Sequence, residues 1–327
     1  MHTERVELFV SNTEIIKKPF KYQHTMMQRM VALLYAAENK TVDVEAIRHS
    51  NELIKQNTKR FSTFRGFSSF SIAAMLSLTN DGLTRLQHML QVYDLMKDIK
   101  FRNSEYLVMA AYQIAAQAPP EQFQHAVQRA KTFYDQMKTE HPILTGRDDY
   151  IFTAMLALSD LKPDSTIVRM ERFYQDLKST FSAGNHLQSL TQVLVMGSND
   201  PEVNARIMTL RDTFRARKLR MDKTYTLPSL GLLTLLPSDP EKLTDEVVDT
   251  YDWLRSQKGF GPWSIHKQEL LLFSSALTIL EHVENLRSEV LPTAMSTTIT
   301  NMIIAQQAAM TAAAAASAAA AASQSSG

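Results

Sequence analysis

One short group in the middle of the chain has side chains that could do chemistry. Arg147, Asp148, Asp149 and Tyr150 are consecutive, and His141 precedes them. The two acids, with the base and the phenol beside them, could bind a divalent metal ion or a basic peptide, and together with His141 around a metal they would form a hydrolase site. A helix start uses the same residues for local reasons, because an N-cap Asp and a first-turn acid both stabilise a helix. We favour this second interpretation, with Asp148 as the N-cap and Asp149 in the first turn.

A second group could bind a polyanion. Between Arg206 and Lys223 the chain carries seven basic side chains and two acids, a density that suits phosphate contacts with nucleic acid or carboxylate contacts with an acidic protein. A solvated helix face has the same pattern and needs no binding partner, and we favour that interpretation. The candidate basic surface consists of Arg211, Arg215, Arg217, Lys218 and Arg220.

A third group interleaves bases with aromatic residues. No acid interrupts the run from Lys55 to Arg65, which also holds Lys59 and Arg60. Four phenylalanines accompany these bases at intervals of three, namely Phe61, Phe64, Phe67 and Phe70. Alternating cations and rings occur in proteins that bind single-stranded nucleic acid. A spacing of three also marks one buried helical or 3₁₀ face, and we favour burial.

Other catalytic patterns are missing from the sequence. The chain of 327 residues has no Cys, so disulfides, thiolate metal sites and a thiol nucleophile are excluded. No two of the nine histidines lie four residues apart, so no HExxH zinc helix is present. We find no glycine-rich phosphate loop and no GxSxG elbow. We therefore expect no cofactor and no bound metal, and we assign no catalytic residue.

The elements that would position these groups recur along the chain. Six similar segments follow one another at intervals of about forty residues, each with a base four residues after an anchor position. The anchors are Asn51, Tyr93, Tyr134, Tyr174, Phe214 and Tyr251. Apolar residues stand seven and four positions before the anchor and three after it, which is the stripe of a half-buried helix.

The stripe is most regular in the middle of the array. The units of Tyr93, Tyr134 and Tyr174 fill every place of the stripe. The first unit has Asn51 at the anchor, and the fifth has Arg217 three residues after it. Terminal repeats of an array are often atypical, because they cap it.

A second, more apolar helix precedes each anchor helix. Examples are the runs that begin at Ala73, Val108 and Ala154, where small residues would let neighbouring helices approach closely. Turn residues such as Asn80-Asp81-Gly82 and Pro119-Pro120-Glu121 separate the two helices. The sequence thus predicts an all-α, HEAT-like α-solenoid of helical hairpins.

We expect a single domain with two terminal segments. Residues 1–22 would cap the array, 23–289 would form the helical repeats, and 290–327, which carry no charge, would form an alanine-rich helix or tail. The tail is long enough to span a bilayer but only weakly apolar, so membrane contact there is the less favoured alternative. The first residues include Glu4, Arg5 and Glu7 and do not form a secretory signal, which favours the cytoplasm.

The chain resembles an uncharacterised family of bacterial, mainly Firmicutes, proteins known as domain of unknown function four thousand and three. The resemblance rests on Arg147-Asp148-Asp149-Tyr150, on Asn185-His186-Leu187-Gln188-Ser189-Leu190, on the single-domain length and on the alanine-rich ending. It would cover nearly the whole chain. The family implies no activity, cofactor or site.

Three functions remain open at this stage. A non-enzymatic scaffold that binds a protein or peptide is the first, because repeat arrays present broad surfaces. A metal-dependent hydrolase that uses His141, Asp148 and Asp149 is the second. A nucleic-acid binder that uses the 206–223 helix is the third, and the net charge of +1 offers it no global attraction. We lean away from an enzyme and expect neither nucleic acid nor, apart from the tail, a membrane as partner.

Overall fold

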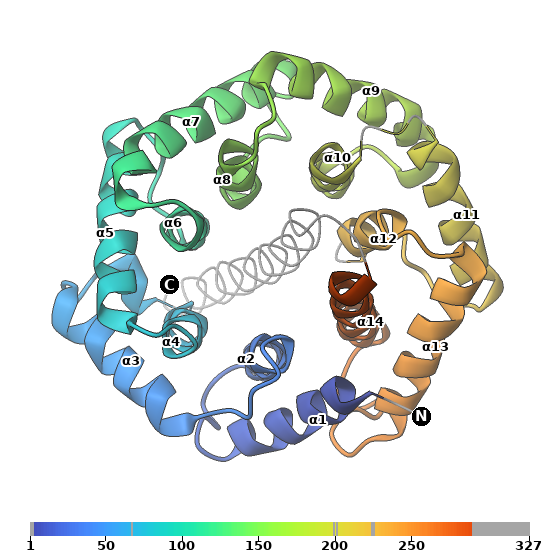
Figure 1. Ribbon diagram of the computed structural model, residues 1–327, viewed down its shortest axis with the longest axis horizontal. Helices are drawn as coiled ribbons and strands as arrows, with labels where there is room; N and C mark the ends of the chain where they lie inside the picture. Colours follow the sequence, from blue (N-terminus) through green and yellow to red (C-terminus); the bar gives the residue numbers. More distant parts are fainter. Residues whose placement is uncertain (1–2, 67, 199, 201, 224–225, 290–327) are drawn as a thin grey trace, which may run out of the picture. The chain divides into compact units, whose positions relative to one another are not determined.

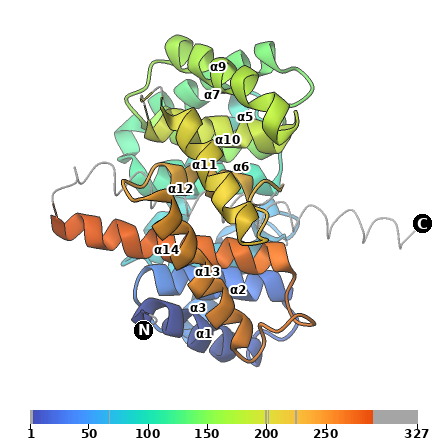
Figure 2. The same ribbon diagram turned by 90° about the vertical axis from the view of Figure 1, so that its right-hand side faces the viewer.

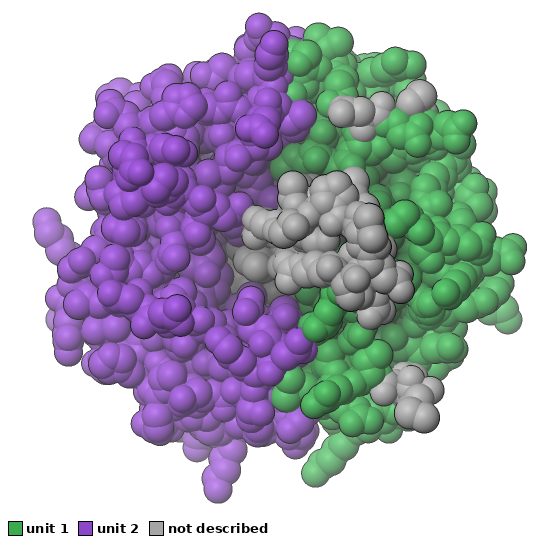
Figure 3. Space-filling model, in the orientation of Figure 1, with its two compact units in different colours: residues 1–10, 165–303 green, residues 11–164, 304–327 purple. Residues whose placement is uncertain are grey.

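The computed structural model describes residues 3–66, 68–198, 200, 202–223 and 226–289. The alanine-rich segment 290–327 and Phe67, on which the sequence makes predictions, lie outside the described residues. Every regular element of the described part is helical, which confirms the all-α fold class. The helices form two compact units, which Figure 3 shows in different colours. The unit boundaries fall inside α1 and α9, and residues 11–164 make up unit 2.

The helices alternate between two kinds. The odd-numbered helices are α1 (Glu4–Lys17), α3 (Val44–Asn57), α5 (Gly82–Asp98), α7 (Phe123–Glu140), α9 (Pro163–Phe181), α11 (Val203–Ala216) and α13 (Pro240–Ser256). Most of them are long and polar on one side. The even-numbered helices are mostly shorter and more apolar; they are α2 (Thr25–Ala37), α4 (Ser69–Ser77), α6 (Glu105–Gln117), α8 (Tyr150–Leu158), α10 (Asn185–Gly197), α12 (Leu227–Thr234) and α14 (Lys267–Glu289).

Each unit is built from two layers of helices. In unit 2, α3, α5 and α7 lie side by side in one layer, and α2, α4, α6 and α8 form the other (Figure 1). In unit 1, α11 lies beside α13 (Figure 2), while α10, α12 and α14 form the second layer. An odd helix packs on the even helix that follows it, for example α3 on α4 and α13 on α14. Long and apolar helices thus alternate in both units, but anchor helices such as α5 and α13 pack mainly on the apolar helix after them, whereas the sequence pattern pairs them with the one before.

The predicted stripes face the interior. Leu86, Met89, Tyr93 and Met96 of α5 are all buried. The corresponding residues of α7 and α9 are buried too, except that Tyr134 is half-buried. Burial of a large apolar side chain stabilises the fold by about 1.5–3 kcal/mol, so one four-residue stripe is a major contribution to each unit.

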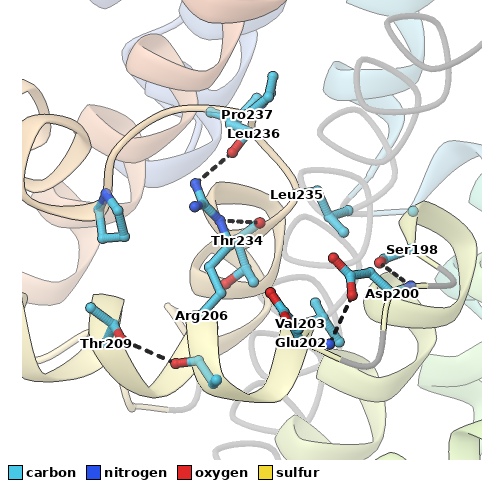
Figure 4. Close-up of a pocket in the computed structure, with 13 residues that line it drawn as sticks. Ser198, Asp200, Glu202, Val203, Arg206, Thr209, Thr234, Leu235, Leu236 and Pro237 are labelled. Atoms are coloured by element: carbon cyan, nitrogen blue, oxygen red, sulfur yellow. Dashed lines mark hydrogen bonds between the residues drawn. The ribbon is translucent and has the colours of Figure 1, made fainter.

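Arginines repeat on the odd helices and hold the ends of the even helices. In each case the guanidinium donates to backbone carbonyls that have no acceptor role inside the helix. The donors and their acceptors are Arg85 with Ala115, Arg129 with Ala157, Ser159 and Leu161, Arg169 with Val195 and Ser198, and Arg206 with Thr234, Leu236 and Ser238. Figure 4 shows Arg206 pointing at the carbonyls of Thr234 and Leu236. Burial lowers the pKa of the Arg169 and Arg206 guanidinium groups.

Small residues permit close helix contacts, as the sequence predicts. A Cβ added at Gly231 in α12 would lie 2.7 Å from Leu190 Cδ1 and 3.2 Å from Val193 Cγ1, both of α10. These distances are shorter than ordinary van der Waals contact, so α10 and α12 approach more closely than larger residues would allow. Within the described part of the chain, no helix combines the length and the hydropathy needed to cross a membrane.

Candidate functional site: a pocket at Asn51

Two anchor tyrosines pack against the loop that follows the preceding odd-numbered helix. Tyr93 of α5 packs edge-on against Phe64, with ring centroids 5.2 Å apart. Tyr134 of α7 packs against Phe101 with the rings tilted at 52° and the centroids 5.6 Å apart. Phe64 and Phe101 lie in the α3–α4 and α5–α6 loops, so each ring comes from the loop that follows the preceding odd-numbered helix. The anchor therefore fills the space between consecutive hairpins with an aromatic ring.

Helix α3 departs from this arrangement. Its anchor position holds Asn51, a short polar side chain, and the α1–α2 loop, which follows the preceding odd-numbered helix, supplies Phe20. Phe20 packs instead on Phe70 of α4, with ring centroids 4.7 Å apart. A cavity of about 250 Å³ opens where an anchor ring would otherwise stand, and Asn51 lines it. We call this cavity the Asn51 pocket.

The Asn51 pocket has an apolar floor and a polar rim. Phe20, Ile47, Phe70 and Ala73 form the floor, and the rim contains Gln23, Arg48, Asn51, Lys55, Arg65 and Ser69. The carboxamides and the hydroxyl offer hydrogen-bond donors and acceptors together, as a peptide backbone does. Single side chains that enter such a pocket gain from the apolar floor and are oriented by the rim.

The rim cations differ in how firmly they are held. The Arg65 guanidinium donates to the carbonyls of Lys55 and Thr58 and to Thr58 Oγ1, so it secures the end of α3. Arg48 pairs with Glu45 and Lys55 with Glu52, each at 2.7 Å and with both side chains exposed. Exposed pairs contribute about 0–1 kcal/mol, so a ligand carboxylate can replace either glutamate at small cost.

The two loops beside the pocket carry exposed bases and exposed aromatic rings. Lys18 and Lys21 in the α1–α2 loop, and Lys59 and Arg60 in the α3–α4 loop, are exposed. We call these four residues the loop bases. Tyr22 is 90% exposed and Phe61 95% exposed, each next to a loop base. Aromatic residues and cations are enriched where proteins meet partners, so these loops extend the candidate site beyond the pocket.

The Arg147–Tyr150 group serves the local structure. A 3₁₀ turn, Arg147–Asp149, precedes α8, so the helix starts one residue later than the sequence predicts and Asp149 rather than Asp148 is its N-cap. Asp149 is buried, and its Oδ2 accepts a hydrogen bond from the Gly146 amide at 2.8 Å. Asp148 Oδ1 also lies over Gly146, 2.6 Å from where a Cβ would stand.

Tyr150 lies in an aromatic cluster. Its ring meets Phe101 at 4.8 Å and Tyr134 at 5.2 Å, and its hydroxyl accepts from the Arg102 amide at 3.2 Å. Burial, followed by the nearby Tyr150 and Asp149, raises the pKa of Tyr134 to about 12. His141 ends α7, and its amide donates to the Met137 carbonyl. Among the described residues no group of three or more His, Asp or Glu side chains is placed to hold a metal ion.

The candidate basic surface is largely matched by acids. Arg211 pairs with Asp212 at 2.7 Å, and Arg217 pairs with Asp245 of α13, also at 2.7 Å. Arg215 and Arg220 share the buried carboxylate of Asp222. Burial of that carboxylate opposes ionisation, but hydrogen bonds from Arg220 and Arg215 outweigh it and hold the pKa of Asp222 well below its ordinary value. The backbone carbonyl of Lys218 accepts a hydrogen bond from Lys267 Nζ at 2.7 Å.

A larger cavity, of about 510 Å³, lies between α11 and the ends of α10 and α12 (Figure 4). Most of its polar side chains already bond to the backbone. Arg206 donates to α12 carbonyls, and Asp200 Oδ1 accepts from the Glu202 amide at 2.9 Å. This cavity consequently offers a ligand less polar recognition than the Asn51 pocket does.

Comparison with known proteins places the chain in a family. The family model described as "Protein of unknown function (DUF4003)" matches residues 12–308. The chain belongs to the DUF4003 family. It is also similar to "Uncharacterized protein YeaA" of Bacillus subtilis (strain 168), with 24% identity over 296 residues, which cover 89% of this chain and 87% of the relative. No solved structure matches the chain significantly. The resemblance found in the sequence is confirmed.

Two features of the sequence of this DUF4003 chain point to the pocket. Asn51 interrupts the row of aromatic anchors, and that departure is visible without coordinates. Phe20 and Gln23 gave no signal, because they belong to a loop outside the repeated stripe. The acid-free stretch from Ile15 to Ala37, which contains Lys18 and Lys21, is a second signal that charge patterning could have found.

Proposed function

We propose that the chain is a non-enzymatic helical-repeat scaffold that binds a segment of another protein in the Asn51 pocket. The observation that carries this proposal is the missing anchor ring. α5 and α7 close the corresponding space with Tyr93 and Tyr134, whereas α3 leaves it open beside an apolar floor. A buried apolar site that water would otherwise fill gains free energy when a side chain enters it.

The size and lining of the pocket favour a protein segment over a small cofactor. A volume of about 250 Å³ is below the roughly 300–1,000 Å³ of sites that enclose a drug-sized molecule. One large side chain is a suitable occupant, and Gln23, Asn51 and Ser69 supply hydrogen bonds for the adjoining backbone. Helical repeats commonly bind extended segments along their surfaces, which supports the proposal by analogy.

The two alternatives draw less support from the geometry. A hydrolase at His141, Asp148 and Asp149 would need acids that point to a shared ligand, but both Asp side chains turn back on Gly146. A nucleic-acid site on the 206–223 segment would need cations available to phosphates, but four arginines there pair with Asp212, Asp222 or Asp245. We place the binding in the cytoplasm, as the sequence favours.

Peptide selection tests the proposal directly. We would select a random peptide display library against the full-length protein and measure the binding of enriched peptides to wild type and to Asn51→Tyr. The added ring restores the anchor and fills the pocket, so we expect affinity to fall at least about tenfold, or about 1.4 kcal/mol.

A matched control separates pocket filling from a general effect of tyrosine. Gln56 is exposed on the same helix, and Gln56→Tyr should leave binding unchanged. A selection that enriches no peptide, or peptides that bind Asn51→Tyr as tightly as wild type, would contradict the proposed function.

A further inference from the structure

The charges around the Asn51 pocket indicate what kind of segment it takes. Resting on the proposed function, we infer that the partner segment is acidic: one aromatic side chain enters the pocket, and carboxylates on either side of it contact the loop bases. The inference depends on charge complementarity over two loops that meet at the pocket. Phe20 and Gln23 line it from the α1–α2 loop, and Arg65 lines it from the α3–α4 loop.

The positive charges of the loop bases are not balanced by acids of the surrounding described chain. None of Lys18, Lys21, Lys59 and Arg60 forms an ion pair with a residue that the structure describes. No acid occurs in the sequence between Glu14 and Glu38 or between Glu52 and Asp81. The 206–223 segment, in which α11 ends at Ala216, differs in this respect, because its arginines have carboxylates beside them. Like charges gathered on a surface repel one another, and an anionic ligand relieves that repulsion.

The two exposed rings extend the same site. Lys21 Nζ lies 4.9 Å from the centroid of the Tyr22 ring, and Arg60 Cζ lies 5.9 Å from that of Phe61. A cation over a ring is held near it, and both remain available to a ligand. An acidic segment with apolar side chains can therefore contact ring and base together in each loop.

Two other anionic surfaces have part of this chemistry. Single-stranded nucleic acid would stack bases on Tyr22 and Phe61, and an anionic bilayer would accept the same rings at its interface. The pocket distinguishes them from a peptide. It is concave, its floor rings Phe20 and Phe70 already pack on one another, and its rim has acceptors as well as donors. Phosphates accept hydrogen bonds but do not donate them, so they leave the rim acceptors unused.

Defined probes test the inference on the full-length protein. We would measure fluorescence anisotropy with three labelled 11-residue peptides: one Phe flanked by Asp and Glu, the same peptide with Ala for Phe, and the same peptide with Asn and Gln for the acids. A 12-nucleotide single-stranded DNA and phosphatidylglycerol/phosphatidylcholine vesicles complete the set. We expect the first peptide to bind about tenfold more tightly than either of the other two.

Charge reversal locates the effect. Lys18→Glu combined with Lys59→Glu should weaken the acidic peptide at least about fivefold, and rising salt should weaken it as well. Lys258, an exposed base in unit 1, provides the control, and Lys258→Glu should have no effect. Circular dichroism would verify that each variant folds.

Each contrary result has its own meaning. Equal binding of the neutral and acidic peptides, both sensitive to Asn51→Tyr, would overturn the inference and leave the proposed function standing. Equal binding of the Phe and Ala peptides would overturn the role of the pocket as well. Binding of DNA or vesicles that depends on Lys18 and Lys59, with no peptide binding, would replace the acidic segment by that surface.

Discussion

Tyr93 packs edge-on against Phe64, with ring planes at 73°, and this contact joins α5 to the α3–α4 loop. Position 51 of α3 is the corresponding place, and it holds an asparagine beside a cavity. Asn51→Tyr should therefore be accommodated, and we expect the free energy of unfolding to rise by about 1 kcal/mol, as for other cavity-filling changes. Urea denaturation measures this change. A loss of more than about 1 kcal/mol would mean that the anchor position is already filled.

The arginine contacts at the helix ends should matter for stability. Arg129 donates to the carbonyls of Ala157, Ser159 and Leu161, each at 2.9 Å. Arg129→Ala leaves these acceptors without that donor, and we expect a loss of about 2–3 kcal/mol in urea denaturation. Arg129→Lys should recover only part of it, because an ammonium lacks the planar fork.

A neighbouring base on the same helix provides the comparison for Arg129. Lys131 pairs with Asp135, which is exposed. Lys131→Ala should change the free energy of unfolding by less than about 0.5 kcal/mol. Equal effects of Arg129→Ala and Lys131→Ala would show that the carbonyl contacts contribute nothing particular.

The raised pKa of Tyr134 predicts that the folded protein loses stability at high pH. Its pKa is raised from 10.0 to about 12 in the folded protein, chiefly by burial. Between these two values the unfolded phenol ionises while the folded one stays neutral, so rising pH favours unfolding. Tyr134→Phe keeps the ring but cannot ionise, and its free energy of unfolding should fall less steeply from pH 10 to pH 12. Urea denaturation across that range would show parallel curves if the prediction is wrong.

The lowered pKa of Asp222 predicts that the folded protein loses stability at low pH. Its pKa lies below the ordinary 3.8 because hydrogen bonds from Arg220 and Arg215 outweigh the effect of burial. The resulting stability is present above pH 3.8 and is lost as the pH falls through the folded pKa. Asp222→Asn should lower the free energy of unfolding by about 1–3 kcal/mol at pH 7, and the difference from wild type should shrink in acid. A difference that does not vary with pH would contradict the ion-pair explanation.

Most of the fold follows from patterns in the sequence. The stripe around Tyr93 and Tyr174 predicts buried helix faces, and both residues are buried. Turn residues such as Asp81 predict helix starts, and Asp81 does cap α5 through the Thr84 amide. These features depend on local spacing and capping, which neighbouring residues determine.

The candidate site was less predictable because its residues come from separate segments of the chain: the α1–α2 loop, α3, and the α3–α4 loop with α4. Asn51 alone signals only an irregular repeat, and the pocket needs Phe20 to meet Phe70 across the sequence. Phe61 shows the same limit. It shares the spacing of Phe64 and Phe70, which are buried as predicted, yet it is exposed. Spacing cannot distinguish them, because the chain around Phe61 is a turn and not part of a regular face.

Photo-crosslinking tests the central claim most directly. A display-selected peptide with benzoylphenylalanine at its apolar position would be irradiated with the full-length protein, and the adducts would be mapped by mass spectrometry. We predict adducts within residues 18–24 and 47–73, which hold the lining of the Asn51 pocket, and their loss in Asn51→Tyr. Adducts confined to residues 141–150 or 206–223 would contradict the account.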